Sequence, residues 1–106
     1  MKIFLHTLME KTMSKTIANS ETGKNDYIFS IFDNVAQSFE PPFTEKNKGT
    51  AIRRIQDLIQ NNVNSPYAKF PDNFALYHIG YFDHEDGSIL DIESSHTIDF
   101  EQLKKE

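Results

Sequence analysis

Cysteine is absent from this chain of 106 residues. Its absence excludes disulfide bonds, thiolate metal sites and a cysteine nucleophile. The chain also lacks any apolar run near the roughly 18 residues of a transmembrane helix, so we expect no segment that crosses a membrane. The opening residues, MKIFLHTLM, form a broken apolar run that is too short and too polar for a secretory signal. We therefore expect a cytosolic protein.

Aromatic residues compensate for a modest apolar content. Only 38% of the chain is hydrophobic, but 12% is Phe or Tyr, and such large rings close a small core with few aliphatic residues. The length fits one small domain, which we expect to cover residues 26–93. Residues 94–106 are then an acidic C-terminal tail or a short helix that begins at Ser94 or Thr97.

Residues 1–25 are expected to form an N-terminal extension. From Lys11 onward this segment is polar and rich in Ser, Thr and Asn, a composition typical of a flexible arm. A short packed helix is the alternative, because apolar residues cluster near the start of the chain. These residues are Ile3, Phe4, Leu5, Leu8 and Met9.

Charge is distributed unevenly along the chain, whose net charge is −5. Residues 41–70 carry five basic and two acidic side chains, whereas residues 71–106 carry nine acidic and two basic ones. An acidic protein is a poor non-specific ligand for nucleic acid, yet a local basic patch can still contact phosphates. A solvated helix face beside an acidic tail is the alternative interpretation of the same pattern.

The stretch FALYHIGYFDHEDGSILDI predicts a β-hairpin. Two runs rich in β-forming residues, 74–82 and 88–93, flank a polar segment that ends in Asp86-Gly87. Glycine takes a positive φ without a Cβ clash, so the tight point of the turn is expected at this pair. Gly80 interrupts the first strand and indicates either a bulge or a close backbone approach.

The remaining elements predict an α+β fold. Residues 27–33 are aromatic and β-branched and favour a strand. Pro41 and Pro42 indicate a long ordered loop over residues 35–48, with Phe39 and Phe43 packed on the core. Apolar residues at 3–4 residue spacing predict a main helix over about residues 50–61, capped by Thr50. Ser65-Pro66 favours one further helical turn over residues 66–70. We expect a small antiparallel sheet covered by this helix in two layers.

Neither catalysis nor metal binding has a convincing pattern. His78, His84 and His96 lie near several carboxylates, but their spacing does not fix a ligand geometry. A calcium loop that begins at Asp83 would need Glu at its twelfth position, which is Ser94. The chain also has no glycine-rich phosphate loop, nucleophile elbow or zinc-protease helix. We expect a non-enzymatic protein without catalytic residues, metal or cofactor.

Nucleic-acid binding has candidate residues of two kinds. The net-basic segment supplies candidate phosphate contacts, which are Lys46, Lys48, Arg53, Arg54 and Lys69. Exposed rings on a sheet can stack with unpaired bases, and Tyr27 and Tyr81 are the candidates if they face outward. The other strand rings are expected in the core. They are Phe29, Phe32, Phe74, Tyr77 and Phe82.

From Tyr27 onward, the chain resembles the nonstructural protein of gokushovirus-type microviruses, which are small single-stranded DNA phages. The pieces that carry the resemblance follow one another in order. They are IFSIFDNVA (28–36), Pro42-Phe43, Gly49-x-Ala51-x-Arg53, Ala68-Lys69 with Pro71-x-x-Phe74, and Leu76-Tyr77-x-Ile79-Gly80-x-Phe82-Asp83 closing on Gly87. Residues 1–25 and the tail after Glu93 lie outside this shared pattern.

The resemblance implies a role in viral DNA replication. Members of this family are absent from the virion, act in the cytoplasm of the infected bacterium and are associated with single-strand synthesis, with single-stranded DNA as the expected partner. The alternative is a protein-interaction module that regulates a phage or host replication protein without touching nucleic acid. The acidic segment 71–106 favours this second hypothesis, since it suits a basic partner, and an exposed hairpin edge can pair with a second copy to form a homodimer.

Overall fold

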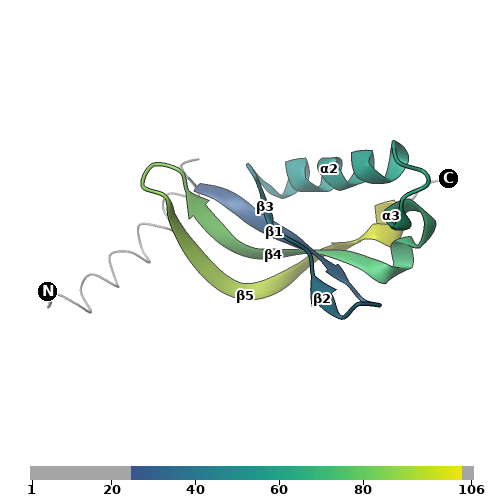
Figure 1. Ribbon diagram of the computed structural model, residues 1–106. Coiled ribbons are helices and arrows are strands. Elements are labelled where there is room, and N and C mark those ends of the chain that lie inside the picture. The colour runs from purple at the N-terminus through teal and green to yellow at the C-terminus, as the bar shows by residue number, and fades with distance from the viewer. Residues whose placement is uncertain (1–24, 104–106) are drawn as a thin grey trace, which may run out of the picture.

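The computed structural model describes residues 25–103 (Figure 1). The expectations for residues 1–24 and 104–106 lie outside this range. Within it, a curled antiparallel sheet packs against one main helix, which confirms the predicted two-layer α+β fold.

Five strands form the sheet. They are β1 (Asn25–Asp33), β2 (Ser38–Phe39), β3 (Phe43–Glu45), β4 (Phe74–Asp83) and β5 (Ser88–Asp99). The order β2-β1-β4-β5 places β1 and β4 in the middle, and β3 pairs with β1 along the same edge as β2. All these pairings are antiparallel. The predicted strand 27–33 and hairpin 74–82/88–93 are therefore confirmed, and both are longer than expected.

Helix α2 (Lys48–Gln60) begins at a capping box. Asn47 is the N-cap: its Oδ1 accepts a hydrogen bond from the Thr50 backbone N–H at 2.9 Å, and its own N–H donates to Thr50 Oγ1 at 3.3 Å. The reciprocal bonds satisfy two backbone donors that the first turn leaves without partners. The sequence-based assignment of Thr50 as N-cap is wrong, because Thr50 occupies the third helical position.

The turn after α2 forms as predicted from Ser65-Pro66. Helix α3 (Pro66–Lys69) starts with proline, and Ser65 Oγ accepts a hydrogen bond from the Ala68 N–H at 3.3 Å. The short 3-10 helix η1 (Pro71–Asn73) then leads into β4. Tyr67 anchors this segment, since its hydroxyl donates to Glu40 Oε1 at 2.7 Å. Burial and this hydrogen bond raise the pKa of Tyr67 to about 12.

Residues 35–48 contain two short strands where only a loop was expected. Strands β2 and β3 pair with β1 on either side of Pro41-Pro42, where the missing N–H groups interrupt the ladder. Phe43 packs against the core as predicted. The same expectation for Phe39 is wrong, because that ring is 47% exposed.

The C-terminal part of the described chain belongs to the sheet and its core. Strand β5 continues six residues beyond Glu93 to Asp99. The prediction of a helix that starts at Ser94 or Thr97 is therefore wrong. The 3-10 helix η2 (Phe100–Leu103) follows and buries Phe100 and Leu103 against the main core.

Both alternatives for Gly80 apply. The β4–β5 register is irregular between His78 and Gly80, and a Cβ at Gly80 would lie 2.7 Å from the Leu90 carbonyl oxygen. The hairpin turn is the predicted one: Gly87 has a φ of +77° and donates its N–H to the Asp83 carbonyl.

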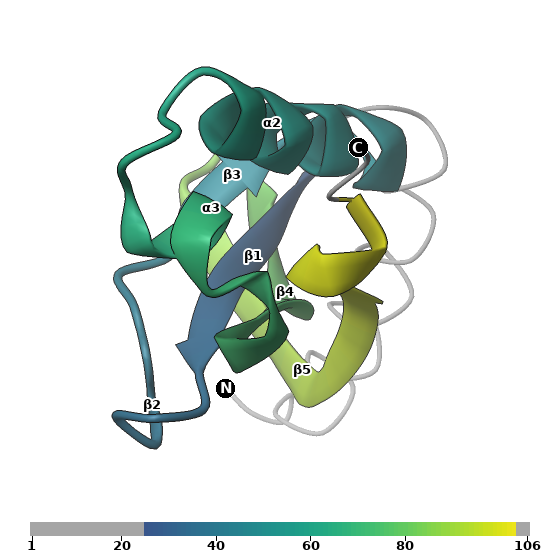
Figure 2. The same ribbon diagram turned by 90° about the vertical axis from the view of Figure 1, so that its right-hand side faces the viewer.

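The core lies between the sheet and the helices. Phe29, Ile31, Phe74 and Leu76 point toward α2, which contributes Ala51, Ile55 and Ile59. Helices α2, α3 and η2 gather over this side of the sheet (Figure 2), and no helix of residues 25–103 covers the opposite side. Within residues 25–103, the sheet therefore has one face packed against helices and one face without a helix, which is called the uncovered face below.

Replacing Phe100 with alanine tests whether the residues after Glu93 are structural. Phe100→Ala should lower the free energy of unfolding in urea by about 3–5 kcal/mol, because a fully buried ring is lost. Phe39→Ala is the matched control and should cost about 1 kcal/mol, since that ring is half exposed. Equal losses for both variants would contradict the assignment of Phe100 to the core.

Gly80→Ala should also destabilise the fold, by about 1–3 kcal/mol, because the new methyl group collides with backbone rather than with a flexible side chain. Gly49→Ala is the control, since its Cβ would meet only Asn47 Oδ1, at 3.3 Å. If thermal unfolding shifted no more for Gly80→Ala than for Gly49→Ala, the close approach of β5 would be disproved.

Candidate nucleic-acid interface

Two cross-strand rows of side chains lie on the helix-facing side of the sheet. In the first row, Tyr27 of β1 stands opposite Glu45 of β3 and Tyr81 of β4. In the second, Phe29 stands between Phe43 and His78. Directly opposite residues in antiparallel strands point to the same face, which brings these side chains together.

The rings in these rows contact one another. The Tyr27 ring stacks on His78 with centroids 4.8 Å apart and meets Tyr81 edge to face at 5.2 Å. His78 also meets Tyr81 edge to face at 4.9 Å. Tyr27, His78 and Tyr81 are called the aromatic cluster below.

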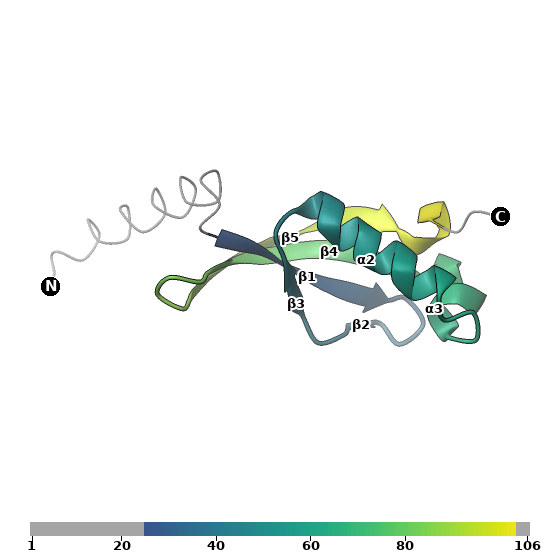
Figure 3. The same cartoon turned by 90° about the horizontal axis from the view of Figure 1, so that it is seen from above.

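The aromatic cluster lies near the beginning of α2. The start of β1 and the β4–β5 hairpin extend past the first turn of this helix (Figures 1 and 3). Tyr27 and Tyr81 are consequently half-buried, whereas Phe29 beneath the helix is fully buried. The two tyrosines do not lie on the uncovered face of the sheet, yet part of each side chain reaches solvent.

His78 is the buried member of the cluster. Its Nε2 donates a hydrogen bond to the Gly80 carbonyl oxygen at 2.9 Å. Burial lowers the pKa of His78 below its ordinary 6.5, and the positive charge of Lys48 lowers it further, against the opposing effect of that hydrogen bond. The imidazole is therefore neutral at pH 7 and contributes a ring rather than a charge.

The predicted cations do not form one patch. Lys46 and Lys48 lie at the beginning of α2, and Lys69 ends α3 beyond the other end of that helix, whose 13 residues span roughly 20 Å. Arg53 lies in the middle of α2 and is exposed. Lys46, Lys48 and Arg53 make no ion pair with another residue of the range 25–103.

Arg54 is already engaged within the molecule. Its guanidinium lies over the Phe43 ring, 4.2 Å from the centroid, and its Nη1 donates to Glu45 Oε2 at 2.9 Å. This arrangement ties α2 to β3. Sequence reasoning missed Glu45 as a member of the site, because β3 is only three residues long and directly follows two prolines.

His78 and His96, which were considered for a metal site, lie on opposite faces of the sheet. His78 bonds to backbone, and His96 Nε2 lies 2.8 Å from Asp99 Oδ1 on the uncovered face. Within residues 25–103, no group of three or more such side chains is arranged to hold a metal ion.

Comparison with known proteins places the chain in a phage family. The family model described as phage ORF5 protein matches residues 26–102, which is more than half of the chain. The chain belongs to the phage ORF5 protein family. No curated protein and no solved structure matches it.

The family match corrects one expectation. Residues after Glu93 were placed outside the shared pattern, but the ORF5 match continues to residue 102 and includes all of β5 and most of η2. In the part of this ORF5-family chain that the structure describes, every helix is too short or too polar to cross a membrane.

The lowered pKa of His78 predicts a pH dependence of stability. Below about pH 6.5 the unfolded chain binds a proton on this ring and the folded chain does not, so the free energy of unfolding should fall as the pH drops from 7 to 5. His78→Phe keeps a ring and removes the titration, so the fall should become smaller. Urea unfolding at several pH values measures it.

His84→Gln is the control for this experiment, because His84 lies exposed in the hairpin turn. This variant should retain the pH dependence of the parent protein. A slope unchanged by His78→Phe would show that His78 does not contribute.

Proposed function

We propose that this ORF5-family chain is the nonstructural protein of a gokushovirus-type microvirus and assists viral DNA replication by binding single-stranded DNA in the host cytoplasm. One observation carries the proposal: exposed cations at the beginning of α2, without an ion-pair partner among residues 25–103, lie on the same side of the sheet as the half-buried tyrosines of the aromatic cluster.

The cations supply the phosphate contacts. Lys46, Lys48 and Arg53 are exposed and have no carboxylate partner within residues 25–103. Arg54 is held by Glu45 and Phe43, and Lys69 lies beyond the other end of α2, so the proposed contacts are the first three. A net charge of −5 confines binding to this local patch.

The tyrosines favour a single strand over a duplex. Base stacking on a side-chain ring requires an unpaired base, and each such contact contributes roughly 1–3 kcal/mol without selecting a sequence. Tyr27 and Tyr81 lie on neighbouring strands at the same register position with their rings edge to face, and they are the candidate stacking residues. The proposed activity is non-enzymatic, since binding alone requires only these contacts.

A protein-interaction module is the second candidate function. It is favoured by the exposed carboxylates of the β4–β5 hairpin turn, Glu85 and Asp86. Such a surface suits a basic phage or host replication protein.

Removing two lysines tests DNA binding. Lys46→Gln with Lys48→Gln should weaken binding of a fluorescent single-stranded oligonucleotide by about tenfold at low salt, because two phosphate contacts are lost. The slope of log affinity against log salt should also fall by about 0.7 for each lost contact. Fluorescence anisotropy at four or more salt concentrations provides both values.

Lys69→Gln is the matched control, because it removes one charge beyond the opposite end of α2. Its affinity should stay within about twofold of the parent protein. A flat titration of the parent protein would disprove direct DNA binding and support the protein-interaction module.

A further inference from the structure

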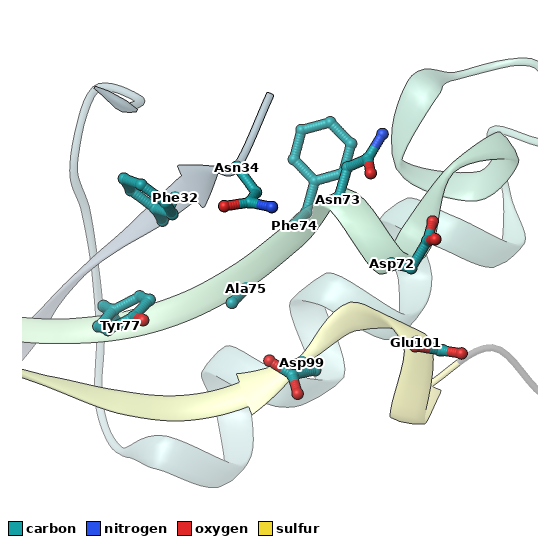
Figure 4. A pocket seen from close by; sticks show the side chains of 9 residues that line it. All are labelled: Phe32, Asn34, Asp72, Asn73, Phe74, Ala75, Tyr77, Asp99 and Glu101. Atoms are coloured by element: carbon teal, nitrogen blue, oxygen red, sulfur yellow. The ribbon is translucent and has the colours of Figure 1, made fainter. Parts of the chain in front are cut away.

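A cleft of about 260 Å³ opens at one end of the sheet, where β1 and β5 end and β4 begins (Figure 4). It is separate from the aromatic cluster, which lies on the helix-facing side. The residues that line the cleft include Phe32, Asp72, Ala75, Tyr77, Asp99 and Glu101.

The strand register explains why a space exists here. On the uncovered face, Ala75 of β4 stands between Phe32 of β1 and Asp99 of β5. A methyl group thus lies between an aromatic ring and a carboxylate, and it leaves a gap between two larger side chains (Figure 4). Tyr77 borders the same gap, with its ring 6.1 Å from that of Phe32.

Phe32 and Tyr77, which line the cleft, are half-buried and lie next to Phe39, which does not line it. Phe32, Phe39 and Tyr77 form a group of rings whose neighbouring centroids lie between 4.9 and 6.1 Å apart. Phe39 remains 47% exposed, and no helix of the described range covers this face. An uncovered group of rings beside a cleft is typical of an interaction site.

The negative charge of the cleft favours a positively charged ligand. Asp72, Asp99 and Glu101 line it, and no Lys or Arg does. Asp99 contacts His96, whereas the carboxylates of Asp72 and Glu101 make no hydrogen bond or ion pair with another residue of the described range. These charges repel phosphate and therefore disfavour contact of the DNA backbone with this cleft.

We propose that this cleft binds an arginine side chain of a protein partner. A guanidinium is planar, so it stacks on an aromatic face such as that of Phe32 or Tyr77 while its N–H groups donate to a carboxylate such as that of Asp99. The ammonium group of lysine carries the same charge but cannot form the stacked, forked contact.

The arginine comes from another protein rather than from a second copy of this chain. The sequence holds only two arginines, Arg53 and Arg54. Arg54 already pairs with Glu45 and lies over Phe43, which leaves Arg53 alone as a donor. The cleft shares no residue with the proposed DNA contacts, so either proposal can fail without the other.

Anisotropy of a fluorescein-labelled peptide of alternating Gly and Arg tests the proposal, with the Gly-Lys peptide as reference. The parent protein should bind the Arg peptide about threefold or more tightly than the Lys peptide. Ala75→Leu fills the gap without changing the charge and should weaken Arg-peptide binding by about tenfold. Asp72→Asn with Glu101→Gln should cause a similar loss.

Asp91→Asn with Glu93→Gln is the matched control. It removes two charges from exposed positions of β5 outside the cleft and should change affinity less than about twofold. Thermal unfolding checks each variant, and if Ala75→Leu is not folded, the Asp72 and Glu101 pair decides the test.

Three results of the peptide titrations would overturn the proposal. They are equal affinity for the Arg and Lys peptides, equal loss in the control pair and the cleft pair, and undiminished binding by folded Ala75→Leu. Sedimentation velocity of the protein alone tests whether a second copy of this chain binds in the cleft. Self-association that both Ala75→Leu and Arg53→Ala abolish would assign the cleft to a second copy and also overturn the proposal.

Discussion

The antiparallel pairing of β1 with β4 is the constraint on which both faces of the sheet depend. Its register sets Tyr27 opposite Tyr81 and Phe29 opposite His78 on the packed side, and Phe32 opposite Ala75 on the uncovered side. Because side chains alternate along a strand, a shift of one residue would exchange the two faces. The hydrophobic residues that pack under α2 therefore fix, in the same step, the side chains that form both proposed sites.

The sheet separates two kinds of charge. Cations at the beginning of α2 accompany the aromatic cluster on the packed side, while carboxylates accompany Phe32 and Tyr77 at the other end of the uncovered side. The two proposed sites therefore combine aromatic side chains with charges of opposite sign, which suit different classes of ligand. The net charge of −5 does not show that cations and carboxylates lie on different sides of the sheet. Only the positions of these side chains in the structure show it.

Elements with a clear sequence pattern of their own were predictable, and elements held in place only by pairing with another strand were not. Helix α2 and the Asp86-Gly87 turn follow from apolar spacing and from glycine, which act over a few residues. Strands β2 and β3 exist only because β1 offers them an edge. The polar run Ser94-Ser95-His96 has weak strand propensity and is held in β5 by β4.

The candidate site, too, could be predicted from the sequence only in part. Residue type identified Lys46 and Lys48 as exposed cations, but it could not show that Glu45 holds Arg54 or that Lys69 lies beyond the other end of α2. Ala75 carried no signal in the sequence, because its importance comes from the size of its two cross-strand neighbours.

The central pairing also has a consequence for how the chain folds. Hairpin β4–β5 joins neighbouring segments, but β1 must wait for a partner that follows roughly fifty residues later in the chain. During synthesis β1 leaves the ribosome first, with Phe29 and Ile31 still lacking the strand and helix that cover them. Docking of β1 onto the completed hairpin is therefore expected to limit the folding rate, and a nascent chain that stops before Phe74 has no route to the native sheet.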